Sequence, residues 1–188
     1  MSVILGKALS AEEAAALPFK EQCLKWHNEF RKKHQVGPVT WSEELANGAK
    51  SWADYLAENK TFEHAPNLQP GENLYLSGKP PPKEPCTEAT KLFYGEVTNY
   101  DFNKPGFSKN TGHFTQLVWK NTKVIGAAYA TGTDGFVVVV VRYSPAGNFN
   151  NDYRENVFPE RKDSGGVDQT RSSLFFISFA IIALNVFF

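Results

Sequence analysis

The chain has 188 residues, enough for one domain with a sizeable core, alone or with tails. Its 20 basic and 20 acidic residues cancel, which excludes nucleic-acid binding driven by overall charge. The only two cysteines, Cys23 and Cys86, exclude a disulfide framework but allow a single bridge.

Residues 1–17 are interpreted as an extension that precedes the domain. They do not resemble a secretory signal, because Glu12 and Glu13 interrupt the apolar residues. Ser2 follows the initiator Met where N-myristoylation requires glycine.

Helical spacing of apolar residues predicts two helices in the next third of the chain. The first runs from Pro18 to Gln35. Thr40 to Glu43 has the form of a capping box, and the second helix is expected to continue from it to Leu56.

A loop from Thr61 to Gly71 and a short strand from Asn73 to Leu76 are expected next. Gly78 to Pro85 is rich in proline and is interpreted as a stiff connector rather than a polyproline ligand. Thr87 is expected to cap a third helix that reaches Tyr100.

The second half of the chain predicts a short helix from His113 to Trp119, capped by Asn110 or Thr111, and then two strands. The strands are Lys123–Thr131 and Phe136–Tyr143, with a hairpin turn between them. Because residues 136–141 are all apolar, we expect the second strand to be buried on both faces, with helices on both sides of the sheet. Helices followed by a hairpin predict an α+β, three-layer sandwich.

The end of the chain is read as a polar linker, residues 160–173, and an apolar tail, residues 174–188, which leaves the domain at 18–159. As a helix the tail would span about 22 Å, short of a bilayer core of roughly 30 Å. A tail anchor is narrowly favoured over a GPI signal, because the latter needs a route into the endoplasmic reticulum. A surface helix is disfavoured, because the tail lacks a polar face.

Two residues stand out chemically. His113 opens the short helix, where the helix dipole favours a neutral imidazole, the form that ligates metals or acts as a base; the alternative is a polar niche near the surface. Glu96 lies four residues after Leu92, on the apolar stripe of the third helix. A buried carboxylate needs a partner or a cavity, although a residue at the stripe edge could instead reach solvent.

Four segments, in order, resemble the motifs of the CAP superfamily, which comprises cysteine-rich secretory, antigen 5 and pathogenesis-related proteins. The long signature is similar to Gly112–Thr122, and the second signature to Val139–Phe149. The HNxxR motif is similar to His27–Arg31, and the GEN motif to Gly71–Leu74. The resemblance covers roughly residues 18–159 and implies an α-β-α sandwich with a central, mostly antiparallel sheet.

The resemblance also implies a central cleft that holds two histidines and two glutamates. By motif these are His64, Glu72, Glu96 and His113. Such a set suits zinc or another divalent cation, and no organic cofactor is expected. A structural role is preferred for His27, Asn28 and Arg31.

The pattern is closest to the small, Golgi-associated members of the superfamily, because Val141 stands where secreted members carry cysteine. Both cysteines are therefore expected to be free thiols in a reducing compartment. The resemblance implies a membrane-associated protein that faces the cytosol and binds lipids, sterols or protein partners, or self-associates, with no nucleic-acid ligand.

Two other functions are weighed against this one. The same four residues could serve a metal-assisted hydrolase, but no serine or cysteine stands in a recognisable nucleophile motif, so catalysis is not expected. An extracellular defence-type module, secreted or GPI-anchored, is disfavoured by the start of the chain and the scarcity of cysteine.

Overall fold

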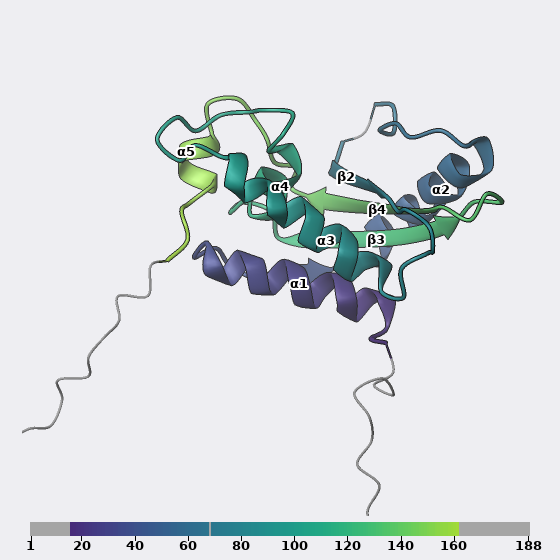
Figure 1. Ribbon diagram of the computed structural model, residues 1–188. Coiled ribbons are helices and arrows are strands. Elements are labelled where there is room, and N and C mark those ends of the chain that lie inside the picture. Colours follow the sequence, from purple (N-terminus) through teal and green to yellow (C-terminus); the bar gives the residue numbers. More distant parts are fainter. Residues whose placement is uncertain (1–15, 68, 162–188) are drawn as a thin grey trace, which may run out of the picture.

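The computed structural model describes residues 16–67 and 69–161, which form a four-stranded sheet between two layers of helices (Figure 1). Across the sheet the strands run β1 (Thr40–Trp41), β3 (Val124–Thr131), β4 (Val137–Ser144) and β2 (Gly71–Leu76). β1 is parallel to β3, and the other two pairings are antiparallel. The expected three-layer sandwich with a mostly antiparallel sheet is confirmed.

The helices are unevenly divided between the two faces of the sheet. α1 (Phe19–Lys33) and α3 (Pro85–Gly95) lie together on one face, and α2 (Glu43–Asn59) covers the other (Figure 1). Three short helices complete the domain, namely η1 (Glu96–Asn99), α4 (Gly112–Leu117) and α5 (Tyr153–Asn156).

The all-apolar run of β4 divides its side chains between the two layers, because successive residues of a strand point to opposite faces. Val139, Val141 and Tyr143 are buried with the residues of α1 and α3. Val138 and Val140 are buried against α2. The prediction that both faces of this strand are covered is therefore confirmed.

Two helix starts differ from the sequence expectation. Thr40 and Trp41 pair with β3, so α2 begins later, and the Ser42 hydroxyl accepts the Leu45 N–H at 3.2 Å. α3 begins at Pro85, a residue suited to the first helical turn because its missing N–H needs no partner there. Thr87 therefore lies inside the first turn rather than at the cap.

The residues of the HNxxR motif have the structural role expected from the sequence, because their side chains bond distant parts of the backbone. Arg31 is fully buried and donates four hydrogen bonds to backbone carbonyls. The Asn28 side chain bonds both the N–H and the C=O of Val39. The four carbonyls belong to Gly37, Leu117, Trp119 and Thr122, so one guanidinium joins α1 to the segment after α4.

His27 is the centre of a second buried network. Its Nδ1–H donates to the Cys23 carbonyl at 2.8 Å, because a carbonyl can only accept. Its Nε2 then accepts from the Tyr143 hydroxyl at 2.9 Å, and that hydroxyl accepts from Asn73. Burial lowers the pKa of His27 to about 4, so the ring is neutral at physiological pH.

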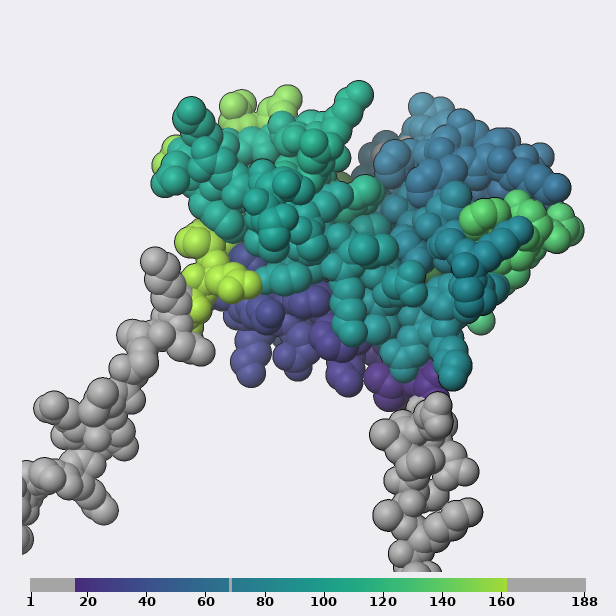
Figure 2. Space-filling model, viewed as in Figure 1, coloured from purple at the N-terminus to yellow at the C-terminus, as the bar shows by residue number. Residues whose placement is uncertain are grey.

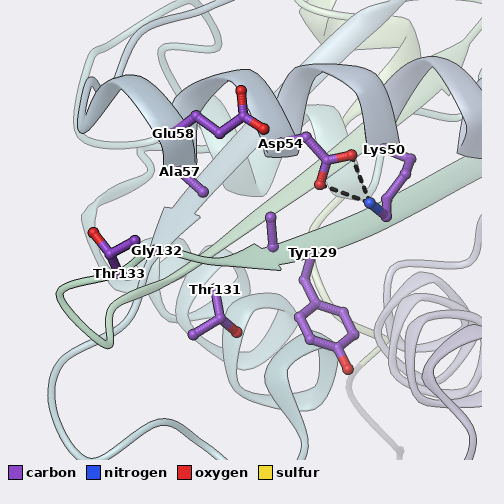
Figure 3. A pocket seen from close by; sticks show the side chains of 9 residues that line it. Lys50, Asp54, Ala57, Glu58, Tyr129, Thr131, Gly132 and Thr133 are labelled. Atoms are coloured by element: carbon purple, nitrogen blue, oxygen red, sulfur yellow. Dashed lines mark hydrogen bonds and ion pairs between the residues drawn. The ribbon is translucent and has the colours of Figure 1, made fainter.

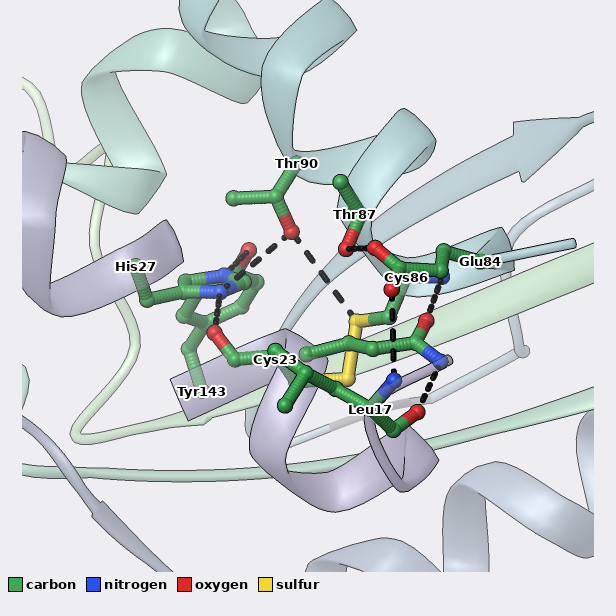
Figure 4. Close-up of a disulfide and its surroundings, with 9 residues drawn as sticks. Leu17, Cys23, His27, Glu84, Cys86, Thr87, Thr90 and Tyr143 are labelled. Carbon is green, nitrogen blue, oxygen red and sulfur yellow. Dashed lines mark hydrogen bonds between the residues drawn. A yellow bond between two sulfur atoms is a disulfide. The ribbon is translucent and has the colours of Figure 1, made fainter. Parts of the chain in front are cut away.

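The expectation of two free thiols is wrong, because Cys23 and Cys86 form a disulfide (Figure 4). Cys23 lies on α1 and Cys86 in the first turn of α3, and the two helices pack side by side with these Cα atoms 5.2 Å apart. Neither cysteine is exposed.

Both ends of the described chain lie at the surface beside α1 (Figures 1 and 2). The Arg161 N–H donates to the Lys33 carbonyl at the end of that helix. Within residues 16–67 and 69–161, no helix combines the length and the apolar character needed to cross a bilayer. Residues 1–15 of the N-terminal extension and the whole apolar tail lie outside the described residues.

Candidate functional site

Two of the four predicted site residues form a tight pair at the start of α4. The Nδ1 of His113 lies 2.6 Å from the Glu96 carboxylate, and the imidazole stacks on Phe93 with 5.0 Å between ring centroids. Because an ionised carboxylate only accepts, the proton of the ring lies on Nδ1. In the neutral ring the lone pair then lies on Nε2, for which no hydrogen bond is found among the described residues.

Glu96 also caps α4 from a distant part of the chain. Its second oxygen accepts the backbone N–H groups of His113 at 2.9 Å and Phe114 at 3.1 Å. Of the two expected caps, Thr111 occupies the cap position but makes no side-chain cap bond. The carboxylate thus takes the role of a local cap and is favoured there by the helix dipole.

The position of Glu96 corrects one expectation and confirms another. α3 ends at Gly95, so Glu96 begins the 3-10 helix η1 and does not belong to the third helix. The prediction that a carboxylate at this place needs a partner is confirmed by its three bonds.

The other two predicted residues form a second pair in which the carboxylate is the buried member. The Nδ1 of His64 lies 3.0 Å from Glu72, whose side chain is 2% exposed, while the His64 side chain is 63% exposed. Glu72 also accepts the Ala65 N–H and lies 3.5 Å from the Nε of Arg142. As in the first pair, the Nε2 of the histidine carries the free lone pair.

The edge strand β2 contacts both pairs. Glu72 and Asn73 are successive residues of this strand, so their side chains point to opposite faces. Glu72 faces Arg142, its partner in β4. Asn73 points the other way and donates to the main-chain carbonyl of His113.

The four residues are therefore brought together as two pairs. In the part of the chain that the structure describes, no group of three or more acidic, histidine or cysteine side chains is arranged to hold a metal ion. Each carboxylate lies behind an imidazole and fixes its tautomer, an arrangement typical of the outer shell of metal-binding histidines. The atoms available to bind a ligand are thus the Nε2 atoms of the two imidazoles, whose side chains are partly exposed.

Arg142 and Asn73 support the site but were not predicted from the sequence. A signal for Arg142 was present, because it is the only charged residue within β4. Its partner followed only from the register that places Glu72 opposite it. Asn73 had no such signal, since its two acceptors come from segments 40 and 70 residues away.

Comparison with known proteins identifies the family of this domain. A model of the cysteine-rich secretory protein (CAP) family matches residues 24–143. The chain belongs to the CAP family. Golgi-associated plant pathogenesis-related protein 1 of Homo sapiens is 39% identical over 155 residues, which cover 80% of this chain and 99% of the human protein.

Solved structures share the fold of this CAP domain at low sequence identity. Venom allergen-like protein 4 of Schistosoma mansoni superposes with a TM-score of 0.60 at 22% identity, covering 78% of this chain and 97% of that one. The crystal structure of NaASP2 with Zn²⁺ gives 0.58 at 20% identity, covering 79% and 89%.

Proposed function

We propose that this CAP domain is a membrane-associated binding module, not an enzyme, and that His64 and His113 bind a divalent cation such as zinc. One observation supports the cation site. Each imidazole donates its Nδ1–H to a buried or half-buried glutamate, which leaves its Nε2 available to a ligand. Neutral imidazole is a preferred zinc ligand, and water would complete the shell.

The proposal assigns different roles to the histidines and the glutamates. The sequence resemblance implied four equal ligands, whereas Glu72 and Glu96 are already engaged by three partners each. The glutamates orient the rings and raise their basicity, and they do not need to touch the ion. NaASP2, whose crystal structure is described as containing Zn²⁺, is consistent with a cation on this fold.

Zinc titration of the full chain at neutral pH tests the cation site. Replacing His113 or His64 with Ala should each weaken binding, whereas Glu63→Gln, which removes an exposed charge next to His64, should not. Equal affinity in the wild type and in both histidine variants would refute the site. Affinity should also fall as the pH is lowered, because a ligating imidazole must be neutral.

Membrane association and the binding of lipids, sterols or protein partners belong to the same proposal. They are supported by the apolar residues 174–188 and by the human relative, whose name places it at the Golgi. Flotation of the full chain with vesicles, compared with a chain that lacks residues 174–188, is the test. Equal flotation of both forms would refute anchoring by the tail.

The disulfide changes the side of the membrane that we propose. The cytosol-facing orientation, inferred from the family resemblance, implied two free thiols, and the Cys23–Cys86 bridge contradicts that consequence. Disulfides persist in the secretory lumen and outside the cell, so the lumenal or extracellular orientation, including the GPI alternative, is now favoured.

A further inference from the structure

One motif of the sequence is not used by the fold or by the candidate cation site. Asn59-Lys60-Thr61 is the only Asn-X-Ser/Thr triplet, with X other than proline, in all 188 residues. Such a triplet is the acceptor sequence for N-linked glycans, and it acts only where the chain enters the secretory pathway. A short triplet occurs by chance in many proteins, so its value depends on its surroundings.

The triplet lies where a bulky group can be attached without disturbing the fold. Asn59 is the last residue of α2, and Lys60 ends the helix with a left-handed backbone, φ 52°. Both side chains are exposed. The Asn59 Nδ2 donates to the Tyr55 carbonyl at 2.8 Å, and this bond can persist after modification, because a substituted amide keeps one N–H.

Open space surrounds this end of α2. A shallow pocket of about 460 Å³ borders the last turn, with Ala57 and Glu58 in its lining and the β3–β4 turn opposite (Figure 3). A second, of about 180 Å³, is lined in part by Lys60, Thr61 and Phe62. Because the Asn59 side chain is exposed, a glycan on it would extend toward solvent.

The third residue of the triplet carries a feature that packing does not explain. The Thr61 hydroxyl is buried and has no hydrogen-bond partner among the described residues. Burying an unpaired hydroxyl destabilises a fold, and valine has nearly the same shape without that hydroxyl. A requirement of the acceptor motif for the hydroxyl accounts for threonine at this position.

A separate observation favours the compartment where N-glycans are added. Cys23 and Cys86 are fully buried and joined as a disulfide, 63 residues apart (Figure 4). Such a bridge forms and persists in the oxidising lumen of the endoplasmic reticulum. The disulfide shares no residue with the triplet, so the two observations are independent.

We propose that Asn59 is an N-glycosylation site. An oligosaccharide passes from a polyprenyl diphosphate carrier to the Asn59 amide nitrogen. The bond from the sugar C1 to the amide nitrogen forms and the bond from C1 to the carrier oxygen breaks. The carrier diphosphate leaves with that electron pair, and the proton lost by the amide is released to the diphosphate or to water. Because the Thr61 hydroxyl is buried in the folded domain, the transfer precedes closure of this end of α2.

Mass spectrometry of the protein isolated from its source cells tests the proposal. After removal of N-glycans in ¹⁸O-labelled water, the peptide that contains residue 59 should carry labelled aspartate. A peptide with unmodified Asn59 would overturn the proposal. If the disulfide is formed in that sample, only the glycosylation fails; if the thiols are free, the compartment assignment fails with it.

Variants of the full chain, expressed in cells of the source or a related organism, separate the motif from the fold. Asn59→Gln and Thr61→Val should each lose the whole glycan mass shift, and Thr61→Ser should keep it. Thr61→Val removes the unpaired hydroxyl, so it should fold at least as well as the wild type. A shift that survives Thr61→Val, or that Thr61→Ser abolishes, would contradict the assignment. Zinc titration is unaffected by either result, so the proposed cation site is judged separately.

Discussion

Glu96→Gln is the most informative single substitution, because glutamine keeps the shape of the side chain and replaces one acceptor oxygen with a donor NH₂ group. Glu96 faces three donors: the His113 Nδ1–H at 2.6 Å and two backbone N–H groups at 2.9 and 3.1 Å. Glutamine cannot accept from both sides. One of the two contacts must therefore change.

The cheaper arrangement keeps the amide oxygen on the two backbone N–H groups. In the opposite orientation both backbone N–H groups would face the NH₂ group and lack an acceptor, which costs about 1–3 kcal/mol of stability for each group. In the cheaper arrangement the NH₂ group points at the Nδ1 of His113, which must then accept. The ring proton moves to Nε2, and the lone pair proposed to bind the cation is lost.

The expected result is a 10- to 100-fold loss of zinc affinity, the usual effect of removing the partner behind a ligating histidine, equal to about 1.4–2.8 kcal/mol. The free energy of unfolding should fall by only about 1 kcal/mol, because the cap of α4 becomes neutral but remains. Zinc titration and ¹⁵N NMR of the His113 ring measure affinity and tautomer separately.

Glu63→Gln is the matched control, because it removes an exposed carboxylate near the second imidazole without touching His113. It should leave both the affinity and the tautomer unchanged. If Glu96→Gln binds zinc as tightly as the wild type, with its ring proton moved to Nε2, the reasoning about the free lone pair is refuted.

Three further predictions concern the stability of the fold. Replacing Cys23 and Cys86 with Ala should lower the free energy of unfolding by roughly 2–5 kcal/mol, because the bridge closes a long loop of the unfolded chain; thiol labelling of the unfolded, non-reduced wild type should find no reactive group, and finding two would contradict the bridge. Arg31→Lys should cost about 2–5 kcal/mol in chemical denaturation, because one ammonium cannot serve four carbonyls; a change below about 1 kcal/mol would refute its structural role. Burial lowers the pKa of His27 in the folded state to about 4, below its unfolded value, so the unfolded state binds the proton first. The free energy of unfolding should therefore fall by about 3 kcal/mol as the pH drops from 6.5 to 4. His27→Gln should flatten this dependence of stability on pH, and an unchanged dependence would show that other groups cause it.

The layers of the fold could be predicted because they depend on local periodicity. The all-apolar run of β4 specified a strand covered on both sides, and the apolar spacing of α1 and α2 specified helices with one buried face. Helix ends were less predictable. The capping box predicted a helix that begins after Thr40, but Thr40 pairs with β3 and the cap of α2 is Ser42.

The identities of the site residues could be predicted from motifs, whereas their pairing could not. His64 and Glu72 are eight residues apart, and Glu96 and His113 are 17 apart, so spacing alone gave no reason to pair them in this way. The role of Glu96 as a cap was hidden because the N–H groups that it accepts belong to a helix that begins 16 residues later. The disulfide was missed for a similar reason: it depends on the packing of α1 against α3, and the resemblance pointed to a reducing compartment.

The two halves of the proposed cation site differ in how firmly the chain holds them. His113 lies within α4, stacks on Phe93, and its side chain is 34% exposed. His64 lies in the loop after α2, and its side chain is 63% exposed. Binding through His64 must restrict a freer side chain, and the entropy lost in doing so offsets part of its contribution. His113→Ala should therefore weaken zinc binding by a larger factor than His64→Ala, and titration of the two variants under one set of conditions measures the ratio. A greater loss in His64→Ala would show that the ordering cost is small and that the exposed histidine is the main ligand.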